Sequence, residues 1–219
     1  MNLWRLVKIN GTSRRWLISI ALITIIIIGL AAYFLTSRPR RIEGARILVI
    51  VAEGFDYHEY AGVTGILSRE GATITTASFT KEWISGKHGG CKPDLTFDEV
   101  NVSLYDVVYI PGGNGPYNII TSPESWKVYE IISEANDRGK IIAAICHGPW
   151  VLAGADIVRG KRVTCWNDQK MISDLKAHGA VVDTGKSVVR DGNIITARGP
   201  KAINALAEEI IKAIQEMRG

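Results

Sequence analysis

The chain has 219 residues, of which 26 are lysine or arginine, 22 are aspartate or glutamate and 3 are cysteine. This length is enough for one domain with a sizeable core and an additional segment, and three cysteines exclude a disulfide-stapled scaffold. Eight of the basic residues but only one acidic residue lie at or before residue 46, so the rest of the chain is slightly acidic. A nucleic-acid partner is therefore not expected, because the positive charge does not belong to a domain face.

The first predicted element is an uncharged apolar segment at residues 16–35, rich in isoleucine, leucine and alanine. As a helix rising about 1.5 Å per residue, it would be about 30 Å long, the hydrocarbon thickness of a bilayer. Trp16 and Tyr33 stand near its two ends, where aromatic side chains prefer the membrane interface. We therefore expect a transmembrane anchor and a single-pass membrane protein.

The predicted organisation of the chain follows from this segment. It consists of a basic tail at 1–15, the anchor at 16–35, a polar linker at 36–45 and a domain at 46–219. A cleaved signal peptide is the alternative for the segment, although its apolar core is usually about 7–15 residues long. Basic residues are equally numerous on the two sides, so the side of the membrane on which the domain lies is not predicted.

From residue 46 onward, apolar strands alternate with helices. The predicted strands are 47–52, 72–79, 105–110, 140–145, 180–183, 188–190 and 193–197. The predicted helices are 57–69, 123–138, 150–154, 169–177 and 200–217, and the glycine-rich segment 80–100 contains a candidate hairpin. This order predicts an α/β fold whose mainly parallel sheet is covered on both faces, with a ligand crevice beyond the carboxyl ends of the strands.

Cys146 stands between the strand predicted at 140–145 and the apolar start of the next helix. Its small neighbours, Ala144 and Gly148, suit a sharp, strained turn that exposes a nucleophile, as in a nucleophile elbow. The amino terminus of the following helix is expected to lower the pKa of the thiol and favour the thiolate. We predict that Cys146 is a catalytic nucleophile.

Two further strand ends are predicted to reach the same crevice. Asp56 follows the first strand, and it can carry protons for the thiol, cap the next helix, or do both. Backbone N–H groups of Gly113 and His147 are placed to hold an oxyanion, since glycine allows close approach of main chain. The histidine spacing predicts no metal site. The predicted pocket residues are Gly112, Asn114, Tyr117 and Trp166.

Residues 144–165, with shorter stretches at 86–89, 94–100, 111–113 and 189–200, resemble the PfpI-type intracellular proteases. These proteases form one superfamily with the Parkinson-disease deglycases and are related to class I glutamine amidotransferase domains. The resemblance covers essentially all of 46–217 and implies a flavodoxin-like three-layer sandwich that forms homodimers or higher oligomers. It also implies an activity without a cofactor: peptidase, glyoxalase, protein deglycase or chaperone. By position, Cys146 matches the family nucleophile and His147 its neighbour.

The chain departs from the family pattern at three positions. Asp56 stands where the family usually has a glutamate that contacts the thiol, and Trp166 stands where it often has a pocket tyrosine. Tyr117 stands where PfpI-type members place a glutamate that is thought to reach a histidine of a neighbouring subunit. The missing carboxylate at 117 weakens the protease interpretation most, because nothing is then predicted to orient His147.

These observations predict an enzyme that acts on small 2-oxoaldehydes or their protein adducts through the Cys146 thiolate, with Asp56 moving the proton. The enzyme alternative is a cysteine peptidase or amidase that uses Cys146 and His147. The non-enzyme alternative is a redox-sensing or chaperone-like module in which Cys146 is oxidised. The expected partners are a small carbonyl compound or a peptide, together with the membrane.

Overall fold

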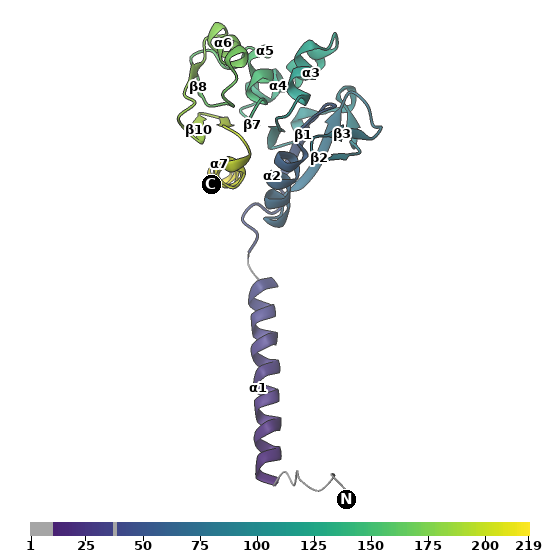
Figure 1. Ribbon diagram of the computed structural model, residues 1–219, viewed down its shortest axis with the longest axis vertical. Helices are drawn as coiled ribbons and strands as arrows, with labels where there is room; N and C mark the ends of the chain where they lie inside the picture. The colour runs from purple at the N-terminus through teal and green to yellow at the C-terminus, as the bar shows by residue number, and fades with distance from the viewer. Residues whose placement is uncertain (1–10, 37–38) are drawn as a thin grey trace, which may run out of the picture. The chain divides into compact units, whose positions relative to one another are not determined.

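The computed structural model describes residues 11–36 and 39–219 (Figure 1). Most of the predicted basic tail, residues 1–10, and residues 37–38 of the predicted linker lie outside the described residues. The chain divides into two compact units between Pro39 and Arg40. The first unit contains a single helix, α1 (Gly11–Thr36), and the second contains all the other described elements.

The predicted membrane anchor at 16–35 falls within α1. In the part of the chain that the structure describes, no helix is both long and apolar enough to cross a membrane. This finding contradicts the predicted single-pass membrane localisation.

A seven-stranded sheet forms the middle layer of the second unit, in the order β10-β11-β7-β6-β1-β2-β5. All neighbouring pairs are parallel except β10 with β11, which confirms the predicted mainly parallel sheet. The central strands β1, β6 and β7 are almost continuously apolar because helices cover both of their faces. The strands are β1 (Arg46–Ile50), β2 (Thr73–Ser78), β5 (Leu95–Thr96), β6 (Val107–Ile110), β7 (Ile141–Ile145), β10 (Val188–Asp191) and β11 (Ile194–Ala197).

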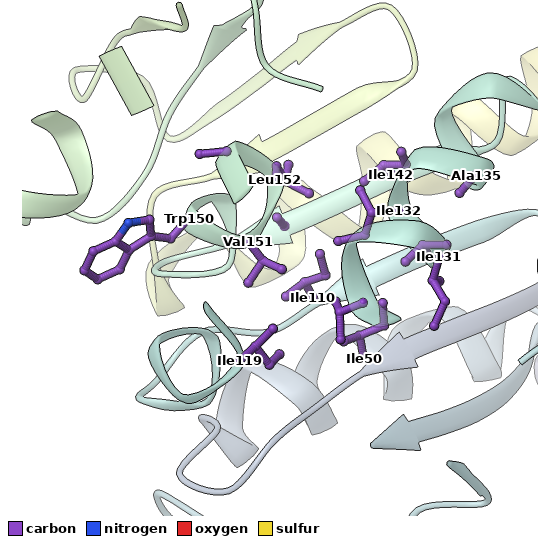
Figure 2. Packing of buried hydrophobic residues seen from close by; sticks show 14 of the residues in the cluster. Ile50, Ile110, Ile119, Ile131, Ile132, Ala135, Ile142, Trp150, Val151 and Leu152 are labelled. Atoms are coloured by element: carbon purple, nitrogen blue, oxygen red, sulfur yellow. The ribbon is translucent and has the colours of Figure 1, made fainter. Parts of the chain in front are cut away.

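Two separate apolar clusters hold the helices to the two faces of this sheet. On one face, α2 (Tyr57–Arg69) and α7 (Ile203–Arg218) bury Val63, Leu206 and Ile210. The other face is covered by α3 (Gly115–Thr121), α4 (Ser125–Asp137), α5 (Pro149–Gly154) and α6 (Gln169–Ala177). Figure 2 shows this second cluster, in which isoleucines of β1, β6 and β7 lie against Ile132 of α4 and Val151 of α5. The result is the predicted three-layer α/β arrangement.

Several local elements differ from the prediction. Helix α3 is absent from the predicted elements because its amino-terminal Gly-Pro has the composition of a turn, although proline is well tolerated in a first helical turn. The predicted strand near 180–183 is β9 (Val181–Val182), which pairs with β8 (Arg162–Val163) outside the main sheet. Segment 80–100 contains the candidate hairpin, formed by β3 (Ile84–Gly86) and β4 (Gly89–Cys91). The remaining elements are short 3-10 turns: η1 (Phe97–Glu99), η2 (Val102–Leu104) and η3 (Pro200–Ala202).

Candidate active site

The carboxyl ends of three neighbouring strands meet at one cavity. Because β6 pairs with both β1 and β7, the turns that follow these strands lie side by side. The cavity has a volume of about 570 Å³ and occupies the place predicted for the crevice. Its lining residues are Glu53, Gly54, Asp56, Ser85, Gly86, Lys87, Gly113, Asn114, Cys146, His147, Trp166 and Pro200.

Cys146 occupies a strained turn directly after β7. Its φ is 60°, in the left-handed region that non-glycine residues rarely adopt, at a cost on the order of 1–3 kcal/mol. A Cβ at Gly112 would lie 2.5 Å from the Cys146 Cβ, and a Cβ at Gly148 would lie 2.5 Å from the Ile110 carbonyl. Only glycine therefore fits at position 112, which lies beside Cys146, and at position 148, in the turn that follows it. The predicted elbow geometry is present.

The carboxyl group beside the thiol belongs to Glu59, in the first turn of α2. The Glu59 side chain is fully buried, and its Oε2 accepts the Gly112 N–H at 2.8 Å. Burial raises the pKa of Glu59 to about 7, while the Gly112 N–H lowers it. Within the described residues, Oε1 of Glu59 has no hydrogen-bond partner. The carboxyl group lies close to Cys146, and each of the two groups shifts the pKa of the other. Glu59 was not among the predicted site residues.

Asp56 has a different position from the one expected of a thiol partner. Its Oδ1 accepts the N–H groups of His58 and Glu59 at 3.0 and 3.2 Å, so it is the N-cap of α2. In a full capping box Glu59 would bond back to the Asp56 N–H, but that N–H donates to the Gly112 carbonyl at 2.9 Å. The Glu59 carboxylate therefore does not bond to its own helix cap; it accepts the Gly112 N–H and lies beside Cys146. Asp56 still lines the cavity, and its predicted role in proton transfer stays a prediction.

Two backbone donors reach the sulfur of Cys146. The N–H groups of Gly113 and His147 both lower the pKa of the thiol, which places the two predicted oxyanion donors at the reacting atom. Burial and then the negative charge of Glu59 outweigh them and raise the pKa of Cys146 to about 12. This rise in the pKa of Cys146 is opposite to the lowering expected from the amino terminus of the next helix, because the thiol is buried against a carboxylate. The resting site therefore holds a thiol and a nearby base.

His147 lies between the thiol and a carboxylate that the sequence did not indicate. Its Nδ1 is 3.4 Å from the Cys146 Sγ, and its Nε2 is 4.0 Å from Oδ2 of Asp168. Burial lowers the pKa of His147, and the negative charge of Asp168 acts against that shift. The other oxygen of Asp168 accepts the Met171 N–H at 2.9 Å and caps α6, which fixes the position of the carboxylate. Asp168 thus supplies, within one chain, an acid next to the histidine.

The predicted pocket residues are distributed unequally. Asn114 and Trp166 line the cavity, and Gly112 forms its wall through the contacts described above. Tyr117 is not among the lining residues. Its ring packs against Trp150 with a centroid separation of 5.8 Å, and the Lys170 ammonium lies 5.5 Å from each of the two ring centroids. The structure therefore brings Asn114 and Trp166 to the site but not Tyr117.

Comparison with known proteins indicates the family of the chain. The family model described as DJ-1/PfpI family matches residues 45–213. The chain is 34% identical to the deglycase PfpI of Pyrococcus furiosus over 171 residues, 78% of this chain and 99% of that protein. It is 33% identical to protein dj-1beta of Drosophila melanogaster over 178 residues, 78% of this chain and 89% of that protein.

Solved structures of DJ-1 and PfpI proteins are also similar to this chain. The crystal structure of Drosophila melanogaster DJ-1beta matches with a TM-score of 0.70 and 30% identity, over 78% of this chain and 91% of that one. A ThiJ/PfpI domain protein from Brachyspira murdochii matches with a TM-score of 0.73 and 26% identity, over 80% of this chain and 98% of that one. The elbow, the sheet order and these similarities together show that the chain belongs to the DJ-1/PfpI family.

Proposed function

We propose that this protein is a cofactor-independent enzyme of the glyoxalase and deglycase type, acting on 2-oxoaldehydes or on their adducts with proteins. The observation that carries the proposal is the buried Glu59 carboxyl beside the Cys146 thiol, with the Gly113 and His147 N–H groups directed at the same sulfur. A nucleophile, a base and two oxyanion donors then meet at one point. The deglycase names of several relatives support the same class of reaction.

The proposed reaction begins with transfer of the thiol proton to Glu59 as Cys146 attacks the aldehyde carbon. A C–S bond forms, and the carbonyl oxygen becomes an oxyanion held by the two N–H groups. It then takes the proton from Glu59 to give a hemithioacetal. Glu59 next removes the proton on C1 to give an enediolate and returns it to C2, while the hydroxyl proton on the C1 oxygen passes to the C2 oxygen. The product is a thioester of the 2-hydroxy acid. Water cleaves the C–S bond and regenerates the thiol, so methylglyoxal and water yield lactate.

The test is turnover of methylglyoxal by the full chain, followed as lactate formation. We expect Cys146→Ser to lower turnover on the order of 10³-fold or more, because the attacking atom is lost. Cys91→Ser is the matched control, since Cys91 is a half-buried thiol of β4 outside the cavity, and it should retain wild-type turnover. Equal turnover by the wild type and Cys146→Ser would rule out the mechanism. Absent turnover with oxidation of Cys146 by mild peroxide would favour the redox-sensing alternative.

The peptidase or amidase alternative has one observation in its favour, the proximity of Asp168 to His147. A carboxylate at this place can hold the imidazole in the tautomer that takes a proton from the thiol. It supplies the orienting acid that the tyrosine at position 117 lacks. The homo-oligomeric state implied by the family resemblance stays a prediction.

If peptide hydrolysis is an activity of this site, we expect Asp168→Asn to lower it on the order of 10²-fold, because the side chain no longer carries the charge that orients His147. Asparagine keeps an oxygen that can cap α6, so folding should be preserved. The measurement is cleavage of fluorogenic peptides, with the exposed Asp137→Asn variant as the control. Unchanged hydrolysis in Asp168→Asn would exclude Asp168 from the mechanism.

A further inference from the structure

Two further cavities adjoin the cavity at Cys146, and Trp166 lines all three. The second, of about 320 Å³, shares Trp166 and Pro200 with the first. The third, of about 290 Å³, shares Trp166 and Arg198 with the second. The second and third cavities, which adjoin each other and the first, are here called together the Trp166 groove. It is lined by Trp166, Asn167, Ser187, Arg198, Pro200 and Lys201 among others.

Trp166 is held at a fixed place between the thiol and the groove. Its backbone N–H donates to the carbonyl of Cys146 at 3.0 Å. Its ring lies against Gly199, where an added Cβ would be 2.9 Å from a ring carbon. Nevertheless 47% of the residue is exposed. An aromatic surface in this position can pack against the stem of a ligand that extends out of the catalytic cavity.

The charge of the groove differs from that of the catalytic cavity. Glu53 and Asp56 line the catalytic cavity together with Lys87, whereas no acidic residue lines either of the two outer cavities among the described residues. Arg198 lines both outer cavities and Lys201 lines the second, and neither forms an ion pair with any described residue. Arg198 donates one N–H to the Thr184 carbonyl at 3.0 Å, which positions its guanidinium at the groove. The groove therefore favours an anionic group.

The size of the site also indicates a ligand larger than a free aldehyde. A cavity of about 570 Å³ lies in the range of roughly 300–1,000 Å³ that holds drug-sized ligands. A three-carbon oxoaldehyde would fill little of it and would not reach Arg198 or Lys201. A chain of a few residues would occupy both the catalytic cavity and the groove.

We propose that the preferred substrate is a 2-oxoaldehyde adduct carried on an acidic peptide segment. The adducted residue enters the cavity at Cys146, the adjoining chain crosses the Trp166 ring, and its carboxylates pair with Arg198 and Lys201. For a cysteine adduct, the C–S bond between the peptide and C1 breaks, the peptide thiol leaves with the hydroxyl proton, and Cys146 attacks the aldehyde so released. This inference rests on the proposed function for the chemistry at Cys146. The recognition of the acidic segment depends only on the groove.

The test compares methylglyoxal hemithioacetals of three short peptides whose single cysteine is flanked by aspartates, by serines or by lysines. For the full-chain enzyme we expect the lowest KM for lactate formation from the aspartate peptide. In an Arg198→Gln, Lys201→Gln double variant, KM for this peptide should rise by about 5- to 20-fold, as expected for two partly exposed ion pairs. Added salt should reduce the advantage of the aspartate peptide in the wild type. Lys92→Gln, an exposed lysine outside the groove, is the control.

Equal KM values for the three peptides, or an unchanged KM in the double variant, would overturn the proposal. Failure of the proposed function is recognised separately, as absence of methylglyoxal turnover by the wild type. In that case binding of the unmodified aspartate peptide to the Cys146→Ser protein, measured by fluorescence polarisation, tests the groove alone. Binding that is weakened by the double substitution supports recognition of the acidic segment, and binding that is unaffected contradicts it.

Discussion

Glu59→Gln is expected to lower turnover of methylglyoxal by at least about 10²-fold, within the range typical of a lost general acid or base. Glutamine has nearly the same shape and keeps an oxygen to accept the Gly112 N–H, so the substitution removes the titrating group and preserves the contact. The thiol then has no base beside it when it attacks. The measurement is kcat and KM for lactate formation, with circular dichroism to verify folding.

The pH profile separates a catalytic role of Glu59 from a structural one. The pKa of Glu59 is about 7, so turnover by the wild type should rise as the pH increases through 7 and the carboxyl group loses its proton. In Glu59→Gln this rising limb of the pH profile should move to higher pH, where the thiol itself ionises. Glu53→Gln, a carboxylate at the rim of the same cavity, should leave the position of the limb unchanged. A limb near pH 7 in Glu59→Gln would exclude Glu59 as the base.

Gly112→Ala is expected to abolish most of the activity and to destabilise the fold. The new Cβ would lie 2.5 Å from the Cys146 Cβ and 2.6 Å from Oε2 of Glu59, so the nucleophile and the base must both shift. Displacement by about 1 Å at a reacting group can reduce the rate ~100-fold, and overpacking typically costs about 1–3 kcal/mol of unfolding free energy. Urea unfolding and lactate formation measure the two effects.

Gly65→Ala is the matched control for this substitution. Gly65 lies in α2, and a Cβ there would meet only the guanidinium end of Arg69, at 3.5 Å. Alanine in a helix interior is favoured over glycine by roughly 0.5–1 kcal/mol, so this variant should be as stable as the wild type or more stable. Wild-type turnover and stability in Gly112→Ala would show that the wall of the site tolerates a side chain.

The placement of the base illustrates what local sequence patterns leave open. The pattern from Asp56 to Glu59 correctly predicts the start of a helix, since Asp56 is its N-cap. Which of the two carboxylates faces the thiol depends on the bond between the Asp56 N–H and the Gly112 carbonyl, 56 positions away in the chain. For the same reason no local pattern indicates Asp168, which reaches His147 because the segment before α6 is held to the elbow by the bond from the Trp166 N–H to the Cys146 carbonyl.

The sequence by itself determined the order of strands and helices, the mainly parallel sheet and the turn at Cys146, because apolar runs, caps and small residues act over a few positions. It also indicated Gly112 and Gly113 at the end of the neighbouring strand. Only the tertiary structure decided that Glu59 faces the sulfur, that Asp168 accompanies His147 and that Tyr117 lies away from the cavity. Burial against a carboxylate likewise set the direction of the Cys146 pKa. These features depend on distances between residues far apart in the chain, which no short pattern encodes.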